Sequence, residues 1–181
     1  MNNVRQYTDE ELLTHAKITK GFKLIPSDYW LKMVRSKEDA KDSFDDKFYL
    51  FKGEEFVFAT SGTTNKGDKG TAVILPGWNY QKWGRGKHKG KMEAYVQIAG
   101  VDFSRDFTVD GKTNPTSPVS NTIIGVNIHA ADYDLTKKIV KVNIGGWSEG
   151  CLVWNNIPDY VKFLALTKGQ QKMTVCLVDE F

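Results

Sequence analysis

The sequence is poor in cysteine and has no long hydrophobic run. Its two cysteines, Cys151 and Cys176, could close one disulfide at most, and neither belongs to a closely spaced metal-ligand pair. No apolar stretch approaches the roughly 18 residues needed to span a bilayer, and the first residues lack the apolar core of a signal peptide. We therefore expect a protein made in the cytoplasm, with no membrane partner and no cofactor or metal.

The overall composition is that of an ordinary globular domain. Hydrophobic residues make up 40% of the 181 residues and charged residues 26%, with a net charge of +3. This length suits one well-cored domain better than two. An aromatic content of 12%, together with many Val, Ile and Thr residues, favours a strand-rich fold. The mild basic excess is compatible with an anionic polymer as partner but does not require one.

The N-terminal quarter of the chain differs in pattern from the rest. A capping box, threonine followed three residues later by glutamate, predicts a helix over 9–18. Near-helical spacing of apolar residues after a proline predicts a second helix over 26–35. We therefore expect a helical extension over 1–45 and a β-rich catalytic body over 46–181, which form one compact unit.

The β-rich body is predicted from short segments of β-branched and aromatic residues bounded by Gly, Asn, Asp or Pro. These strands cover 48–51, 55–60, 71–75, 94–98, 101–109, 123–129, 138–144 and 173–178. A turn is expected at 110–111, an exposed loop at 112–122 and a helix at 157–166. The expected fold class is mainly β (α+β), a sandwich or barrel with short helices.

Cys151 is the strongest candidate for a catalytic residue. It ends the glycine-rich segment Gly145-Gly146-Trp147-Ser148-Glu149-Gly150-Cys151. A thiol becomes a good nucleophile when a nearby base, usually histidine, removes its proton. Glycines beside the nucleophile let backbone N–H groups approach a developing oxyanion. Cys176, in an apolar C-terminal strand, is expected to be a core residue.

The three histidines, His15, His88 and His129, all precede Cys151. This order argues against papain-like, NlpC/P60 and CHAP peptidases, in which the nucleophile comes first. His129 ends an apolar segment 22 positions before the cysteine, which is room for a loop and a returning strand. We therefore expect a hairpin to bring His129 to Cys151 as its base, and His15 to be a surface residue.

The motifs Asn127-Ile128-His129-Ala130 and Ser148-Glu149-Gly150-Cys151-Leu152 resemble those of YkuD-type L,D-transpeptidase catalytic domains. The resemblance covers 123–166, and sequence segments farther upstream resemble those of a phage- and Bacteroidetes-associated branch of the family. It implies an L,D-transpeptidase-like fold and attack by Cys151 on a peptidoglycan stem peptide. It also implies that the carbonyl of Ala130 fixes the imidazole of His129, and that the site loop of Ser148, Glu149 and Gly150 holds the oxyanion. Further substrate contacts are expected from His88, Arg105, Trp147 and Asn156.

Three departures from the family pattern leave the substrate open. Glu149 stands where the family often has histidine, Ala130 where it has glycine, and Val153 where it has an arginine that shapes the substrate site. The missing export signal favours a phage-encoded lytic protein, carried in the virion or released to the cell wall on lysis. The alternative is an inactive virion structural or cargo protein that keeps the fold.

The segment around His88 is basic, with aromatic residues nearby. Three interpretations remain for it: a solvated hairpin, a contact for an anionic substrate and, as the last of the three, a nucleic-acid surface. Arg105-Asp106 fits a structural pair or turn better than a catalytic pair. A zinc site built from His88, His129 and Cys151 has suitable residue types but no spacing signature.

Overall fold

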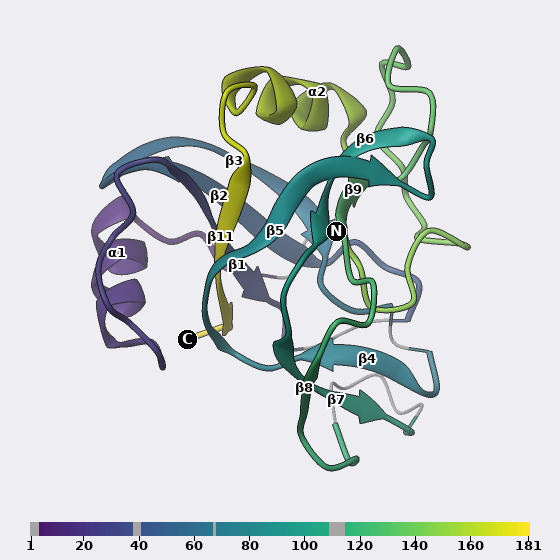
Figure 1. Cartoon of the computed structure of the whole chain (residues 1–181), viewed down its shortest axis with the longest axis horizontal. Helices are drawn as coiled ribbons and strands as arrows, with labels where there is room; N and C mark the ends of the chain where they lie inside the picture. The colour runs from purple at the N-terminus through teal and green to yellow at the C-terminus, as the bar shows by residue number, and fades with distance from the viewer. Residues whose placement is uncertain (1–3, 38–40, 67, 109–114) are drawn as a thin grey trace.

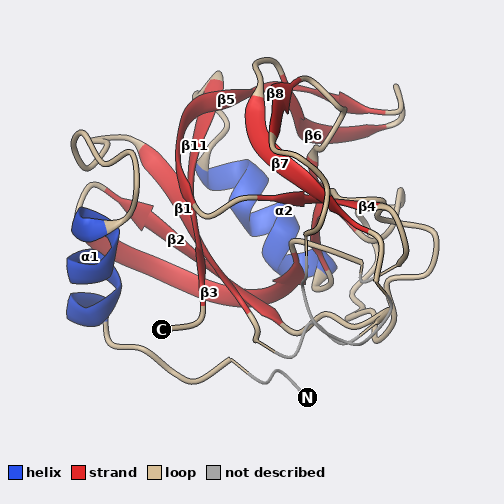
Figure 2. Cartoon of the chain, turned by 90° about the horizontal axis from the view of Figure 1, so that it is seen from below, coloured by secondary structure: helices blue, strands red, loops and turns tan. Residues whose placement is uncertain are grey.

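The computed structural model describes residues 4–37, 41–66, 68–108 and 115–181. It is mainly β, with a closed eight-stranded barrel, a small three-stranded sheet and two helices (Figures 1 and 2). The strands are β1 (Tyr29–Arg35), β2 (Asp46–Lys52), β3 (Glu55–Thr63), β4 (Thr71–Ile74), β5 (Gly77–His88), β6 (Met92–Gln97), β7 (Val101–Asp106), β8 (Ser120–Thr122), β9 (Ile128–Ala130), β10 (Leu152–Trp154) and β11 (Lys172–Asp179). The helices are α1 (Asp9–Ile18) and α2 (Ile157–Leu166).

The barrel strands follow the order β1-β11-β5-β6-β9-β10-β3-β2, and β2 closes the ring against β1. The pairs β1–β11 and β9–β10 are parallel, whereas the other pairs of the barrel are antiparallel. Strands β4, β7 and β8 form the separate sheet, which lies at the lower side of the molecule in Figure 1. Among the described residues, no helix is long and apolar enough to cross a membrane.

Both predicted helices with clear end signals are confirmed. Helix α1 begins with a capping box, in which Thr8 and Glu11 each accept a hydrogen bond from the other's backbone N–H. Helix α2 begins after Asn156, whose side chain accepts a hydrogen bond from the backbone N–H of Asp159 at 3.2 Å. Tyr160 and Phe163 of α2 are fully buried against the barrel core.

The helix predicted over 26–35 is wrong, because this segment contains β1, one of the strands that form the barrel. Leu31 and Met33 face the main core, while Trp30 and Val34 pack in the second cluster beneath α1. A strand with two apolar faces reads as a continuous hydrophobic run, which periodicity alone does not separate from a buried helix segment. The helical extension over 1–45 is therefore limited to α1, and β1 belongs to the barrel.

The strand predicted over 138–144 is also wrong. This segment is a surface connection with only isolated bridges, and Val140 and Val142 are 58% and 81% exposed. The strand predicted over 123–129 is shorter than expected, since β9 begins at Ile128. The backbone before it is held instead by Gln97, whose Oε1 accepts hydrogen bonds from three successive N–H groups at 3.0 to 3.2 Å.

The remaining predicted strands match β2, β3, β4, β6, β7 and β11 within a few residues. Cys176 is fully buried in β11, as predicted. The 12-residue strand β5 was missed, and residues 120–122 of the predicted exposed loop form β8. The expected turn at 110–111 lies outside the described residues.

Candidate active site

Cys151 and His129 meet through two adjacent parallel strands. His129 is the middle residue of β9, and Cys151 immediately precedes β10, where Val153 is the register partner of His129. A backbone hydrogen bond of 2.9 Å from Leu152 N–H to the carbonyl of Asn127 fixes this alignment. The expected hairpin is therefore replaced by a parallel pair, and the long connection between the strands carries the site loop 145–151.

The site loop is fixed by Ser148 and Gly150. The buried hydroxyl of Ser148 accepts a hydrogen bond from Gly150 N–H and donates one to the carbonyl of Cys151, both at 3.1 Å. Gly150 has φ +122°, and a Cβ atom there would lie 2.7 Å from the carbonyl oxygen of Ala72 in β4. Only glycine allows this approach without displacing backbone. Gly150 therefore lets the loop pack directly on the small sheet.

His129 is held as a neutral ring with one free nitrogen. Its Nδ1 lies 2.8 Å from the carbonyl oxygen of Ala130, and because a carbonyl only accepts, Nδ1 carries the proton. The contact predicted between this ring and the Ala130 carbonyl is thus present. Nε2 is fully buried and has no hydrogen-bond partner among the described residues. A buried nitrogen with a lone pair and no donor is costly for stability, and it is suited to accept a proton.

The sulfur of Cys151 lies close to both histidine rings. The Sγ atom and one ring nitrogen each from His88 and His129 all lie within 4.8 Å of one another. The Sγ atom accepts a hydrogen bond from Asn127 N–H at 3.4 Å and donates one to the carbonyl of Gly125 at 3.7 Å. The thiol proton therefore points to the carbonyl of Gly125 in this arrangement and not to His129.

His88 forms the second half of a histidine pair, which the sequence analysis did not foresee. Its ring stacks on that of His129 with centroids 3.9 Å apart and an angle of 22° between the planes. Its Nδ1 lies 3.1 Å from Nδ2 of Asn127. Because Oδ1 of Asn127 accepts from Gln97 N–H at 2.9 Å, Nδ2 is the amide atom that faces His88. His88 Nδ1 therefore accepts, and the proton of the neutral ring resides on Nε2.

Burial keeps the thiol and the imidazole uncharged at rest. It raises the pKa of Cys151, although the N–H of Asn127 and the charge of Lys89 act in the opposite direction. Burial, followed by the neighbouring His88, lowers the pKa of His129 to about 3. Burial and Lys89 also lower the pKa of His88. The three groups therefore rest as a neutral thiol and two neutral rings, and charge develops only when a proton moves.

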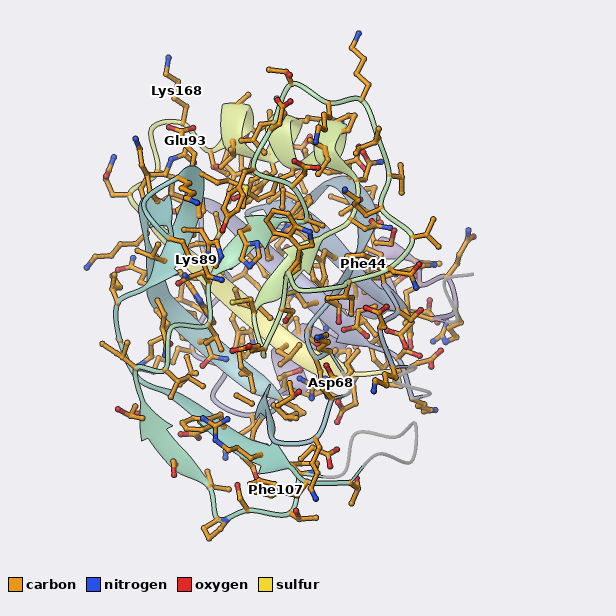
Figure 3. The ribbon with its side chains drawn as sticks, turned by 90° about the vertical axis from the view of Figure 1, so that its right-hand side faces the viewer. Phe44, Asp68, Lys89, Glu93, Phe107 and Lys168 are labelled. Atoms are coloured by element: carbon orange, nitrogen blue, oxygen red, sulfur yellow. The ribbon has the colours of Figure 1, made fainter. Side chains whose placement is uncertain are left out.

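Cys151 and His88 line a cavity of about 480 Å³. Its wall carries four cationic side chains, Lys66, Lys69, Lys89 and Arg105, against two carboxylates, Asp68 and Glu149. Figure 3 views this side of the molecule and labels Lys89 and Asp68 of the wall. A larger hollow of about 620 Å³, beside Tyr29 and Gln170, contains no histidine or cysteine. We therefore place the candidate site in the smaller, more basic cavity.

The other residues proposed for substrate contact fall into two groups. Trp147 and Arg105 line the cavity. Arg105 also donates a hydrogen bond to the carbonyl of Gly70 at 2.8 Å. Asn156, in contrast, lies outside the cavity lining and serves as the N-cap of α2. The expected surface position of His15 is only partly right, because this ring is half-buried and stacks on Phe181 with centroids 3.6 Å apart.

Val153 is fully buried, so the family's substrate-shaping arginine has no polar counterpart at this position. Its side chain packs in a small apolar cluster with Phe44, Ala131 and Ile144. A guanidinium here would have to enter that cluster or displace it. The cations near the thiol therefore come from other segments of this chain, namely the β3–β4 connection, the β5–β6 turn and β7.

His88, His129 and Cys151 are residue types that bind zinc, and the structure brings them together. A shared ion would take Nε2 of His129, because Nδ1 of that ring faces the carbonyl of Ala130. His88 would have to give up its contact with Asn127 or bind through Nε2 after loss of the proton there.

Comparison of the chain with family models, curated proteins and solved structures gives no match. The site must therefore be interpreted from its own geometry. Sequence reasoning missed Asn127 and Gln97 as parts of the site and the stacking of His88 on His129. The one available signal was the Lys89-Gly90 pair, which is typical of a tight turn and places His88 at the end of a strand.

Proposed function

We propose that this protein is a cysteine-dependent acyltransferase or peptidase that acts on peptidoglycan stem peptides through a thioester acyl-enzyme. Two observations carry the proposal: Nε2 of His129 is buried and has no partner among the described residues, and a ring nitrogen of His129 lies within 4.8 Å of the Cys151 sulfur, which lines the cavity. The hydrogen bond from Nδ1–H to the Ala130 carbonyl leaves that nitrogen as the only basic atom of the ring.

The reaction begins when the S–H bond of Cys151 breaks and its proton passes to Nε2 of His129. The sulfur attacks the substrate carbonyl, and the new oxyanion accepts hydrogen bonds from backbone N–H groups of the site loop. The N–H of Gly150 already donates to Ser148, so this mechanism assigns the oxyanion to the N–H groups of Glu149 and Cys151. The imidazolium then gives its proton to the leaving amine, and the acyl group passes from sulfur to another amine or to water.

The cavity wall supports an anionic peptide as substrate. Four cations and two carboxylates leave an excess of two positive charges, and Lys89 acts directly on the pKa values of Cys151, His129 and His88. Peptidoglycan stem peptides carry free carboxylates close to their peptide bonds, which suits such a wall. The same charges would attract nucleic acid, but binding of nucleic acid would give no role to the thiol and the histidine pair at the cavity.

The direct test is incubation of the full chain with purified muropeptides and analysis of the products by mass spectrometry. We expect cleaved or cross-linked peptides with the wild type, and none with Cys151→Ala or His129→Ala. Cys176→Ala is the matched control, because this second thiol lies in the core away from the cavity. Identical products from wild type and Cys151→Ala would refute the enzymatic function.

A second test needs no substrate. A thiol with a raised pKa reacts with iodoacetamide about tenfold more slowly for each pH unit below that pKa. Deprotonation by His129 adds a route that is independent of pH as long as His129 is neutral. We therefore expect a rate plateau in the wild type that disappears in His129→Ala. An inactive structural or cargo protein predicts instead that Cys151 shows no plateau in either variant.

A further inference from the structure

The histidine pair contains one residue that the proposed reaction does not use. His88 ends β5, is 5% exposed and stacks face to face on the proposed base. Its Nδ1 accepts a hydrogen bond from Asn127, which leaves the proton on Nε2, and one of its ring nitrogens lies within 4.8 Å of the Cys151 sulfur. A neutral imidazole with an N–H donor this close to the proposed nucleophile can act on the charge that forms on the sulfur.

Proton transfer from Cys151 to His129 creates two charges in a buried place. The positive charge forms on a ring whose face lies against His88, so a protonated His88 would oppose the transfer strongly. The negative charge forms on a sulfur that has one fixed donor so far, the N–H of Asn127 at 3.4 Å. A neutral His88 avoids the repulsion, and its Nε2–H supplies a second donor to the sulfur.

Resting on the proposed thiol chemistry, we propose that His88 is a third catalytic residue, which stays neutral and donates its Nε2–H to the Cys151 sulfur as His129 takes the thiol proton. In this step the S–H bond breaks, an N–H bond forms at Nε2 of His129, and the electron pair stays on sulfur. His88 neither gains nor loses a proton. A second proton on His88, which enters at Nδ1, breaks the contact with Asn127 and stops the reaction.

The charged and titratable groups around His88 come from several elements. These are His129 on β9, Cys151 and Glu149 on the site loop, Lys89 on the β5–β6 turn, and Tyr133 after β9, whose ring centroid lies 6.5 Å away. Lys91, whose ammonium lies 5.2 Å from the centre of the Tyr133 ring, adds a further positive charge on that side. The charge of Lys89 disfavours a charged His88. Glu149 is exposed and faces the cavity with Cys151, so it offers His88 little compensation.

The test compares two substitutions of His88 in the full chain. His88→Gln keeps an N–H near the position of Nε2 but cannot take a proton. His88→Leu keeps the bulk and removes the donor. The rate of iodoacetamide alkylation is measured against pH by mass spectrometry of the peptide that carries Cys151, with the Cys176 peptide as an internal unreactive reference. Circular dichroism at each pH confirms that each variant is folded.

We expect the wild-type plateau to fall on the acid side, at a pH below the ordinary range of histidine, because burial and Lys89 lower the pKa of His88. His88→Gln should keep the plateau and extend it to lower pH. His88→Leu should lower the plateau about tenfold or more, the loss typical of a hydrogen bond to a charged group. An acid fall in His88→Gln at the wild-type position, or an unchanged plateau in His88→Leu, would overturn this role.

The outcome also separates this role from the proposed function. If the plateau is lost in His129→Ala but neither His88 substitution has an effect, the proposed Cys151–His129 chemistry stands and only the role of His88 is refuted. A plateau that survives His129→Ala removes the proposed function itself. If His88→Leu does not fold, the acid side of the His88→Gln profile still decides, because a merely structural residue would not move it.

Discussion

The packing of the site loop on β4 makes a quantitative prediction for Gly150→Ala. The Cβ atom of an alanine would lie 2.7 Å from the Ala72 carbonyl oxygen and 3.0 Å from its Cβ atom. Ala72 is buried in the middle of β4, where it pairs with Arg105, so it has no free direction in which to move. The residue would also have to adopt φ +122°, a region that only glycine enters readily.

The two effects add to a substantial loss of stability. A non-glycine residue in such a backbone region costs about 1–3 kcal/mol. Forcing an extra methyl group into a packed place costs about as much again, roughly 1–3 kcal/mol. Partial relaxation of the loop would reduce the sum, so we expect a loss of about 3 kcal/mol. For a chain of this length that corresponds to a fall in Tm of roughly 6–12 °C.

The assay is thermal unfolding followed by circular dichroism, with Gly146→Ala as the matched control. Gly146 belongs to the same loop, but a Cβ atom there would have no neighbour within 4 Å. We expect the Tm of Gly146→Ala to stay within about 2 °C of wild type. Alkylation of Cys151 should change in Gly150→Ala, because displacement of the loop alters the 3.4 Å contact with Asn127. Equal Tm values for the two variants would refute the described loop packing.

Two further substitutions test the charges around the site. Lys89→Gly should raise the free energy of unfolding by about 1 kcal/mol, because Lys89 has φ +49° and glycine adopts this conformation without strain. The same substitution should slow the alkylation of Cys151, because the charge that it removes holds the pKa of that thiol down. Faster alkylation than in the wild type would contradict this. Hydrogen bonds from Lys137 above all lower the pKa of Asp132 to about 2, below its unfolded value, so its stabilising effect is present above about pH 4 and is lost as the pH falls. Asp132→Asn should therefore lower the free energy of unfolding, measured with urea, by about 1 kcal/mol at neutral pH. A difference between wild type and variant that stays constant down to about pH 2 would count against the ion pairs with Lys137 and Lys141.

The sequence predicted the parts of the site that depend on local chemistry. Cys151 stood out by its glycine-rich setting, and His129 by its position on an apolar segment before the cysteine. The ends of α1 and α2 were predictable because capping residues act on their own backbone neighbours. These features are determined by a few adjacent residues, and long-range packing did not override them.

The parts that escaped prediction depend on contacts between distant segments. Strand β1 was mistaken for a helix because burial on both faces removes the alternation that marks a strand. His88 lies 41 positions before His129, and only the pairing of β5 with β6 and of β6 with β9 brings the two rings together. The role of Gln97 is similarly invisible, since its side chain holds a segment about 27 residues away.

Burial at the site opposes any charge, whereas fixed backbone dipoles favour a negative charge on the sulfur and a positive charge on the imidazole. Burial alone would leave Cys151 inert, as it does Cys176, because it raises the pKa of both thiols. At Cys151, however, the N–H of Asn127 points at the sulfur, and at His129 the carbonyl of Ala130 faces Nδ1–H. Each backbone dipole stabilises the charge that proton transfer creates at its end and would destabilise the opposite charge. Both dipoles belong to the same short segment, Asn127–Ala130, so this segment carries both the proposed base and the two backbone groups that would stabilise the charged pair.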